Sequence, residues 1–285
     1  MISDQLPAQA VNRVFFRLAG GAQPLLLVPT QVNEQGSFEF ILDTGSGTSL
    51  CSPEVAQAVQ IKGAGTKEGH TAGGKVSVQL ACVDSLSVGS AKVRGLQVAI
   101  TDLRHIGRAV GAKIDGDIGY NFLKRFCLTI NYRDSWITLE PSSAKAAAAQ
   151  KASGQTEIKL RLASPTKPLI LVDAHVNGRG PFQFAIDTGT STTAISEELA
   201  ADLHLERSSM PPVTTGGASI EVAASKLQSL RVGGTSQQDV SVIIGDFLKI
   251  LSQVIGTKLD GIIGYNFLEQ YQVVIDYPNE VLRLV

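Results

Sequence analysis

The chain has 285 residues, of which 44% are hydrophobic and 18% charged, and its formal net charge is −1. This length and composition fit about two folded domains of ordinary size. The near-zero charge excludes the basic surface that nucleic-acid binding requires, and no apolar run approaches the ~20 residues of a membrane span.

Cysteine and histidine give no sign of a metal site or of a disulfide framework. The three cysteines are odd in number, and the four histidines lack the spacing of metal ligands. We therefore expect no metal and no cofactor.

The start of the chain, Met1-Ile-Ser-Asp-Gln, is polar and does not resemble a signal peptide. The sequence is compatible with two cellular locations. A periplasmic or secreted protein is expected if a presequence was removed, and a cytoplasmic protein otherwise.

The predicted elements are mostly strands, and they follow one another in a clear order. Residues 25–28 and 38–42 are apolar segments joined by Asn and Gly, which predicts a hairpin that ends at Asp43. Residues 169–172 and 182–186 repeat the pattern and predict a second such hairpin, which ends at Asp187. Ser52 followed by Pro is typical of a helix N-terminus, and Ser196 followed by two Glu residues is its counterpart, so one short helix is expected after each aspartate loop. A Gly-rich bend at 71–74 precedes an alternating segment, which predicts the tip of a second hairpin.

A nine-residue motif that occurs twice is the most informative feature of the sequence. Phe38-Glu-Phe-Ile-Leu-Asp43-Thr-Gly-Ser and Phe182-Gln-Phe-Ala-Ile-Asp187-Thr-Gly-Thr are separated by 187 − 43 = 144 positions. A second shared block, Asp115-Gly-Asp-Ile-Gly-Tyr-Asn-Phe-Leu and Asp260-Gly-Ile-Ile-Gly-Tyr-Asn-Phe-Leu, is separated by 260 − 115 = 145 positions. The chain is a tandem duplication, and two copies of this length predict two equivalent lobes.

A low-complexity stretch of small and polar residues separates the two copies. Residues 142–155 are rich in Ala, Ser, Lys and Gln, which predicts a flexible linker. We place lobe 1 at residues 12–141 and lobe 2 at residues 156–285.

The duplicated constellation resembles the aspartic peptidases, specifically retropepsin-like domains fused in tandem. It consists of Asp-Thr-Gly followed by Ser or Thr, a Gly-rich hairpin, and later an apolar residue followed by Gly. The resemblance covers nearly the whole chain outside the N-terminal dozen residues and the linker. It implies an all-β fold with short helices, in which two acid-protease β-barrel lobes form a bilobal, pepsin-like pseudo-dimer with a pseudo-twofold axis.

The resemblance also implies the catalytic residues. Asp43 and Asp187 would meet across the lobe interface, share one proton, and activate a water for attack on a peptide bond. This chemistry needs no metal and no cofactor. Thr44 and Thr188 would hydrogen-bond across the interface, and the hydroxyls of Ser46 and Thr190 are expected to donate to the carboxylates.

Two further groups of residues follow from the resemblance. The residues expected to support the active site are Thr44, Gly45, Ser46, Ile118 and Gly119 in lobe 1 and Thr188, Gly189, Thr190, Ile263 and Gly264 in lobe 2. The residues expected on two substrate-binding flaps are Thr71, Gly73 and Gly74 in lobe 1 and Thr215, Gly216 and Gly217 in lobe 2.

The chain departs from the family at positions that bear on substrate binding. Retroviral members carry an acidic residue two places after the Gly of the triplet and an Arg after the later Gly. This chain has Gly47 and Ser191 at the first position and Tyr120 and Tyr265 at the second. Neither Gly-rich hairpin carries the tyrosine of a pepsin flap, so the peptide preference of the family does not transfer.

The expected function is hydrolysis of a peptide or protein substrate by a protein that is active as a monomer. Asp115 and Asp260, which precede Gly, are interpreted first as turn formers. One alternative function is a module of the same fold that binds extended peptides without cutting them; retention of both carboxylates disfavours it. The other is an actin-like or sugar-kinase phosphotransferase, which is disfavoured because the long helices of that fold are missing.

Overall fold

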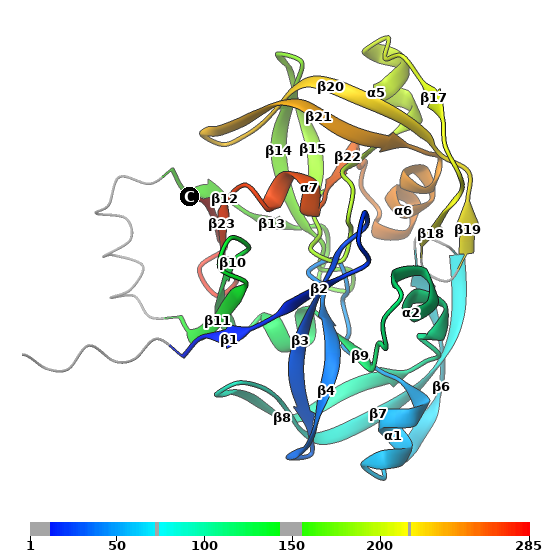
Figure 1. The fold of residues 1–285 in the computed structure, drawn as a ribbon, viewed down its shortest axis with the longest axis vertical. Helices are drawn as coiled ribbons and strands as arrows, with labels where there is room; N and C mark the ends of the chain where they lie inside the picture. The colour runs from blue at the N-terminus through cyan, green and yellow to red at the C-terminus, as the bar shows by residue number, and fades with distance from the viewer. Residues whose placement is uncertain (1–11, 72–73, 143–155, 216–217) are drawn as a thin grey trace, which may run out of the picture.

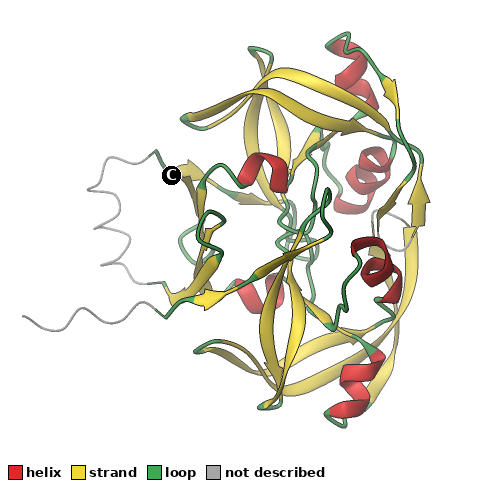
Figure 2. Ribbon diagram, in the orientation of Figure 1, coloured by secondary structure: helices red, strands yellow, loops and turns green. Residues whose placement is uncertain are grey.

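The computed structural model of the protein describes residues 12–71, 74–142, 156–215 and 218–285. These residues are mostly β-strand with a few short helices (Figure 2). The two halves of the chain form two similar lobes (Figure 1), which confirms the predicted fold class. The predicted linker lies outside the described residues apart from Ser142, and the lobe boundaries stay a prediction.

Each lobe contains a closed ring of six strands. The ring of lobe 1 closes through the pairing of β3 with β7, and that of lobe 2 through the pairing of β14 with β20. In order around the ring, the strands of lobe 1 are β3 (Leu25–Val32), β4 (Gln35–Leu42), β9 (Gly116–Ile118), β5 (Leu50–Cys51), β8 (Ala91–Ile100) and β7 (Gly74–Val88). Those of lobe 2 are β14 (Ile170–Val176), β15 (Arg179–Ile186), β22 (Gly261–Ile263), β16 (Ala194–Ile195), β21 (Thr235–Ile244) and β20 (Ala223–Val232).

The hairpins predicted before the two aspartates are present in both lobes. β3 pairs with β4 and β14 pairs with β15, both antiparallel. The last three residues of β4 and of β15 are buried. Such continuous burial is typical of a strand covered on both faces, and it fixes the direction in which each strand delivers its aspartate.

A six-stranded sheet joins the lobes on the side labelled β1, β10 and β23 in Figure 1. At its centre β10 pairs with β23, with Thr129 opposite Val274. These two residues are equivalent in the duplication, since 274 − 129 = 145, so the pseudo-twofold axis passes between them. In order, the strands of this sheet are β1 (Val14–Phe15), β11 (Trp136–Pro141), β10 (Phe126–Asn131), β23 (Gln272–Asp276), β24 (Val281–Leu284) and β12 (Ile158–Lys159).

The outer hairpins differ between the lobes. In lobe 1, β6 (Gly63–Thr71) pairs with β7 along its whole length. In lobe 2 the equivalent segment is divided into β17 (Ser208–Ser209), which pairs with β20, and β18 (Val213–Thr215), which pairs with β19 (Ala218–Ile220). Pro211 and Pro212 lie at the division, and proline has no N–H to donate to a strand ladder.

The helices are short, and the predicted N-caps are formed. The Ser52 and Ser196 side chains accept hydrogen bonds from the N–H groups of Val55 and Leu199, at 3.2 and 3.1 Å. The helices are α1 (Pro53–Ala58), α2 (Arg104–Val110), α3 (Tyr120–Leu123), α5 (Glu197–Asp202), α6 (Phe247–Ile255) and α7 (Tyr265–Leu268). Two further edge strands are β2 (Arg17–Ala19) and β13 (Arg161–Leu162).

Candidate active site

The two predicted aspartates directly follow β4 and β15. Each is held by the short parallel strand beside it. The Asp43 N–H donates to the Ile118 carbonyl, and the Asp187 N–H donates to the Ile263 carbonyl, both at 3.1 Å. The repeated phrase and the later repeated block are thus neighbours in space in each lobe.

The glycines after these isoleucines leave room for the aspartate loops. A Cβ on Gly119 would lie 2.9 Å from the Ser46 carbonyl oxygen, and one on Gly264 would lie 2.7 Å from the Thr190 carbonyl oxygen. Any larger residue at either position would displace the loop. The structure therefore brings the predicted Ile-Gly pairs together with the loops they are expected to support.

Thr44 and Thr188 link the two lobes through buried hydrogen bonds. The Thr44 hydroxyl donates to the Ile186 carbonyl at 3.0 Å, and the Thr188 hydroxyl donates to the Leu42 carbonyl at 2.7 Å. Each hydroxyl also accepts the N–H of the other threonine, at 3.1 Å in both directions. The four bonds are related by the pseudo-twofold axis and fix the two loops relative to one another.

Gly45 and Gly189 bring the two carboxyl groups together at this axis. A Cβ on Gly45 would lie 2.6 Å from Cγ of Asp187, and a Cβ on Gly189 would lie 2.6 Å from Cγ of Asp43. Each carboxyl group therefore lies against the backbone of the opposite loop. Two carboxyl groups held this close are most stable when one of them carries a proton, because ionising both would place like charges side by side.

The Asp187 carboxylate accepts the hydrogen bond that the sequence predicts from Thr190, and a second one from Gly189. Its Oδ1 accepts the Gly189 N–H at 2.8 Å, and its Oδ2 accepts the Thr190 hydroxyl at 2.7 Å. Donors of this kind stabilise negative charge on a carboxylate.

The Asp43 carboxyl differs from its partner. Its Oδ1 accepts the N–H groups of Gly45 and Ser46, at 2.7 and 3.0 Å. The expectation that the Ser46 hydroxyl donates to Asp43 is not met, because this hydroxyl donates to the Thr48 carbonyl at 3.0 Å. Ser46 contributes its backbone instead.

The environment of Asp43 favours its protonated form. Burial, and after it the negative charge of Asp187, raise the pKa of the Asp43 carboxyl from 3.8 to about 8. The hydrogen bond from Gly45 acts in the opposite direction but does not outweigh these two effects.

Asp117 is a third carboxyl group at this site, and we did not predict it. It is buried in β9, the strand that runs parallel to β4, which delivers Asp43. Its equivalent in lobe 2 is Ile262. The available signal in the sequence was the difference between Asp117 and Ile262 inside an otherwise repeated block.

Asp115 and Asp260 are buried but lie apart from the carboxyl pair. They accept the N–H groups of Glu39 and Gln183, at 3.0 and 2.9 Å. Lys113 forms an ion pair with Asp115 at 2.7 Å, and Lys258 pairs with Asp260 at 3.1 Å. These two acids attach the strand β4 or β15 to the segment that leads into β9 or β22.

A repeated asparagine, which we also did not interpret, holds each aspartate loop at its far end. Asn121 accepts the N–H and the hydroxyl of Ser49, at 2.8 and 2.9 Å. Asn266 does the same for Thr193, at 2.7 and 2.8 Å. The identity of the asparagine in both copies was the available signal.

The tyrosines at the position of the family arginine pack across the lobe interface. The Tyr120 ring meets that of Tyr277 with centroids 5.7 Å apart, and the Tyr132 ring meets that of Tyr265 at 5.4 Å, both edge-on. The two contacts are equivalent under the duplication. Aromatic packing thus occupies the position of the ion pair that the sequence lacks.

The predicted flap residues lie on the outer hairpins, as far as they are described. Thr71 pairs with Gly74 next to the tip of the β6–β7 hairpin, and Thr215 pairs with Ala218 in the β18–β19 hairpin. Gly73, Gly216 and Gly217 lie outside the described residues. The role of these segments as flaps stays a prediction.

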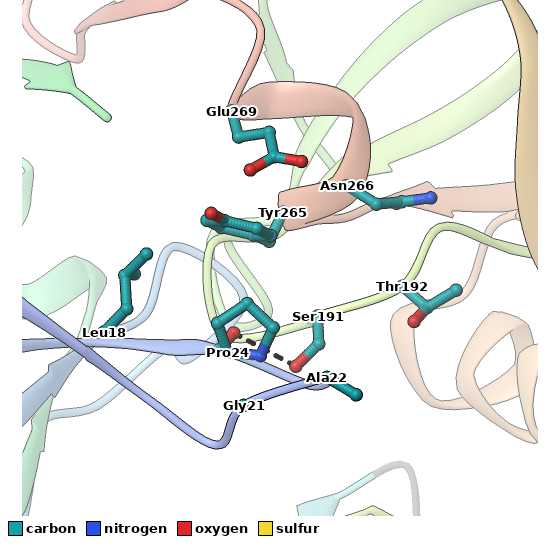
Figure 3. Close-up of a pocket in the computed structure, with 9 residues that line it drawn as sticks. All are labelled: Leu18, Gly21, Ala22, Pro24, Ser191, Thr192, Tyr265, Asn266 and Glu269. Atoms are coloured by element: carbon teal, nitrogen blue, oxygen red, sulfur yellow. Dashed lines mark hydrogen bonds between the residues drawn. The ribbon is translucent and has the colours of Figure 1, made fainter. Parts of the chain in front are cut away.

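A cavity of about 410 Å³ lies where lobe 1 meets the segment that follows the Asp187 loop (Figure 3). Lobe 1 contributes Leu18 and Pro24, and lobe 2 contributes Ser191, Tyr265 and Glu269. The Ser191 hydroxyl donates to the Pro24 carbonyl at 3.1 Å, and the Glu269 carboxylate lies near the Tyr265 ring (Figure 3). The cavity thus contains an acidic group close to one of the aspartate loops.

Comparison with known proteins supports the same interpretation of the two copies. A family model described as aspartyl protease matches the chain twice, at residues 28–122 and 172–267. The two matches cover more than half of the chain and contain both aspartate loops. No curated protein matches the chain. In the described part of the chain, every helix is too short or too polar to cross a membrane.

Proposed function

Because the chain belongs to the aspartyl protease family, we propose that it is an aspartic endopeptidase in which Asp43 and Asp187 of a single chain activate one water. The observation that carries the proposal is the position of each carboxyl group against the opposite loop, at Gly189 and Gly45. The substrate is a peptide or protein, and one chain supplies both acids.

The two acids take different parts in the reaction. Two carboxylates in contact share one proton, because ionising both would place like charges side by side. The raised pKa of Asp43 assigns the proton to that residue, and the hydroxyl of Thr190 stabilises negative charge on Asp187. We therefore assign Asp187 as the base and Asp43 as the acid, with titration belonging to the pair.

Hydrolysis then follows from proton transfers within the pair. Asp187 removes a proton from the attacking water while Asp43 protonates the carbonyl oxygen of the peptide bond. When the tetrahedral intermediate collapses, the C–N bond breaks, the proton on Asp187 passes to the leaving nitrogen, and one hydroxyl proton of the intermediate returns to Asp43. The Thr44 and Thr188 hydrogen bonds keep the two carboxyl groups in place during these steps, so no reorganisation of the loops is needed.

Digestion of denatured proteins tests this function without knowledge of the natural substrate. The chain is incubated with a denatured protein mixture between pH 3 and pH 9, with and without a statine peptide that mimics the tetrahedral intermediate. We expect cleavage at internal peptide bonds, inhibition by the statine peptide, and loss of activity above about pH 8, where Asp43 ionises. Absence of cleavage at every pH, or cleavage that resists the statine peptide but is lost with a serine-directed reagent, would contradict the proposal.

A further inference from the structure

Asp117 lies on the same side of the sheet as Asp43. β9 runs parallel to β4 with Asp117 beside Ile41, and side chains two residues apart on a strand share a face. Ile41 and Asp43 are two apart, so Asp43 and Asp117 face the same way at the end of the strand pair. This register brings the two carboxyl groups close enough for each to influence the ionisation of the other.

The surroundings of Asp117 are apolar, which makes a carboxylate costly there. Its equivalent, Ile262, belongs to a cluster of buried apolar side chains that includes Leu171 and Ala185. The corresponding cluster of lobe 1 contains Leu27 and Ile41, equivalent to those two residues. Asp117 is 6% exposed, and within the described part of the chain its Oδ1 accepts no hydrogen bond from an N–H or O–H group.

Electrostatics at this position also favour a neutral side chain. Burial, followed by the charges of Asp43 and Asp187, raises the pKa of Asp117 well above its ordinary range. The other groups that face it are Ser46, whose hydroxyl donates its proton to the Thr48 carbonyl, and Cys51 on β5. A carboxyl group that carries a proton is both a donor and an acceptor, so a protonated Asp117 can donate to the Asp43 carboxylate.

We propose that Asp117 is a positioning residue for the carboxyl pair: it carries a proton and donates a hydrogen bond to Asp43, which stabilises Asp43 whenever that group is ionised. Lobe 1 thus uses a carboxyl donor where lobe 2 uses the Thr190 hydroxyl. This inference rests on the proposed peptidase function, since stabilising ionised Asp43 assists the step in which it gives up its proton.

Two variants of Asp117 separate this role from a structural one. Asp117→Ile introduces the residue of lobe 2, fits the apolar cluster, and removes the donor. We expect its melting temperature to rise, its kcat to fall about tenfold, and the alkaline limb of its pH profile to move up by about one unit, as expected for loss of a hydrogen bond to a charged group. Asp117→Asn keeps a donor and is expected to stay near wild type in kcat and pH profile.

Asp115→Asn is the matched control, because Asp115 is also buried but lies outside the carboxyl pair. Its pH profile is expected to match that of wild type. The inference is overturned if Asp117→Ile retains the wild-type kcat and pH profile. It is also overturned if Asp117→Asn loses as much activity as Asp117→Ile, because the donor would then have no role.

A measurement without substrate separates this inference from the peptidase function. Carboxyl titrations are followed by ¹³C NMR of aspartate-labelled protein, with Asp43→Asn used to assign the signal of Asp43. The Asp43 titration is expected to move to higher pH in Asp117→Ile. If it moves while the wild-type chain cleaves no peptide, the hydrogen bond is supported and the peptidase function fails. If it stays fixed while the wild-type chain cleaves peptides, the function stands and this inference fails.

Discussion

In lobe 2 the Thr190 hydroxyl donates to the Asp187 carboxylate, whereas in lobe 1 the Ser46 hydroxyl donates to the Thr48 carbonyl. The N–H groups of the two aspartates make the same hydrogen bonds to the strands beside them. The loops differ one step further on, because Ser46 donates its N–H to the Asp43 carboxyl group whereas Thr190 donates its hydroxyl to the Asp187 carboxylate. Two copies of the same loop present one acid with a hydroxyl donor and one acid beside a third carboxyl group, Asp117.

This comparison separates what the two lobes share from what distinguishes them. The shared features, such as the Thr44 and Thr188 bonds, hold the site together and are expected to matter equally in both lobes. The distinguishing features surround the two carboxyl groups and are expected to affect activity unequally.

The largest effect is expected from the two aspartates themselves. Asp43→Asn and Asp187→Asn each remove one acid or base of the pair, so kcat/KM should fall by about a thousandfold or more in both. The measurement is the rate of peptide cleavage at the optimal pH of the wild-type chain. Asp115→Asn and Asp260→Asn are the controls and should lose far less. Equal loss in all four variants would show that the wrong acids have been assigned.

The second prediction concerns the threonines, where the lobes are alike. Thr44→Val and Thr188→Val each leave a buried N–H and a buried carbonyl without a partner. We expect each variant to lose about 2–4 kcal/mol of unfolding free energy, measured by urea denaturation, and to lose activity. A large effect in one variant and none in the other would contradict the equivalence of the two lobes.

The third prediction concerns the hydroxyls, where the lobes differ. Thr190→Val removes the donor to Asp187 and should lower kcat by about tenfold to a hundredfold. Ser46→Ala removes a hydroxyl that does not donate to Asp43 and should lower kcat by about threefold at most. The measurement is kcat of both variants on the same peptide. A larger loss of kcat in Ser46→Ala than in Thr190→Val would mean that the roles of the two acids are the reverse of those assigned.

The fourth prediction is the dependence of stability on pH. Asp43 keeps its proton up to about pH 8 in the folded chain, whereas an ordinary aspartate loses it near 3.8. Between these values the folded chain binds more protons than the unfolded chain, so the free energy of unfolding should fall as pH rises. Urea denaturation at several pH values measures the slope. Asp43→Asn should make the slope shallower, and an unchanged slope would refute the assignment of the proton.

The smallest effect is expected at the cavity beside the Asp187 loop. Glu269 supplies an acidic group there, and its equivalent in lobe 1 is Lys124, which lies over the Tyr120 ring. If the cavity receives a substrate side chain, Glu269→Gln should lower kcat/KM about threefold to tenfold for peptides with Lys or Arg at that position. Paired peptides with Lys and norleucine measure the change. The same loss for both peptides would exclude a role in selecting basic side chains.

Much of the fold and of the site is predictable from the sequence because each local motif occurs once in each copy of the duplication. The hairpins before Asp43 and Asp187 and the N-caps at Ser52 and Ser196 are each marked by residues whose local chemistry is specific. The division of the outer hairpin in lobe 2 was not predicted. The prolines at 211–212 cannot donate to a strand ladder, but the strand that they fail to pair with is known only from the fold.

The parts that were not predicted depend on contacts between segments far apart in the chain. The Ser46 hydroxyl donates to a carbonyl two residues away, and no local pattern distinguishes it from Thr190 in this respect. Asp117 reaches the carboxyl pair only because β9 lies beside β4, a pairing of strands that are far apart in the sequence. Asn121 and Asn266 are repeated, yet their partners, Ser49 and Thr193, are identified only by the fold.

The most direct test of the account is a mixing experiment with the two aspartate variants. Wild type, Asp43→Asn, Asp187→Asn and an equimolar mixture of the two variants are each incubated with a denatured protein, and cleavage is followed by mass spectrometry. Because one chain supplies both acids, we predict that only the wild type cleaves. Cleavage by either variant alone at the wild-type rate, or recovery of activity in the mixture, would contradict the claim that Asp43 and Asp187 of a single chain form the active site.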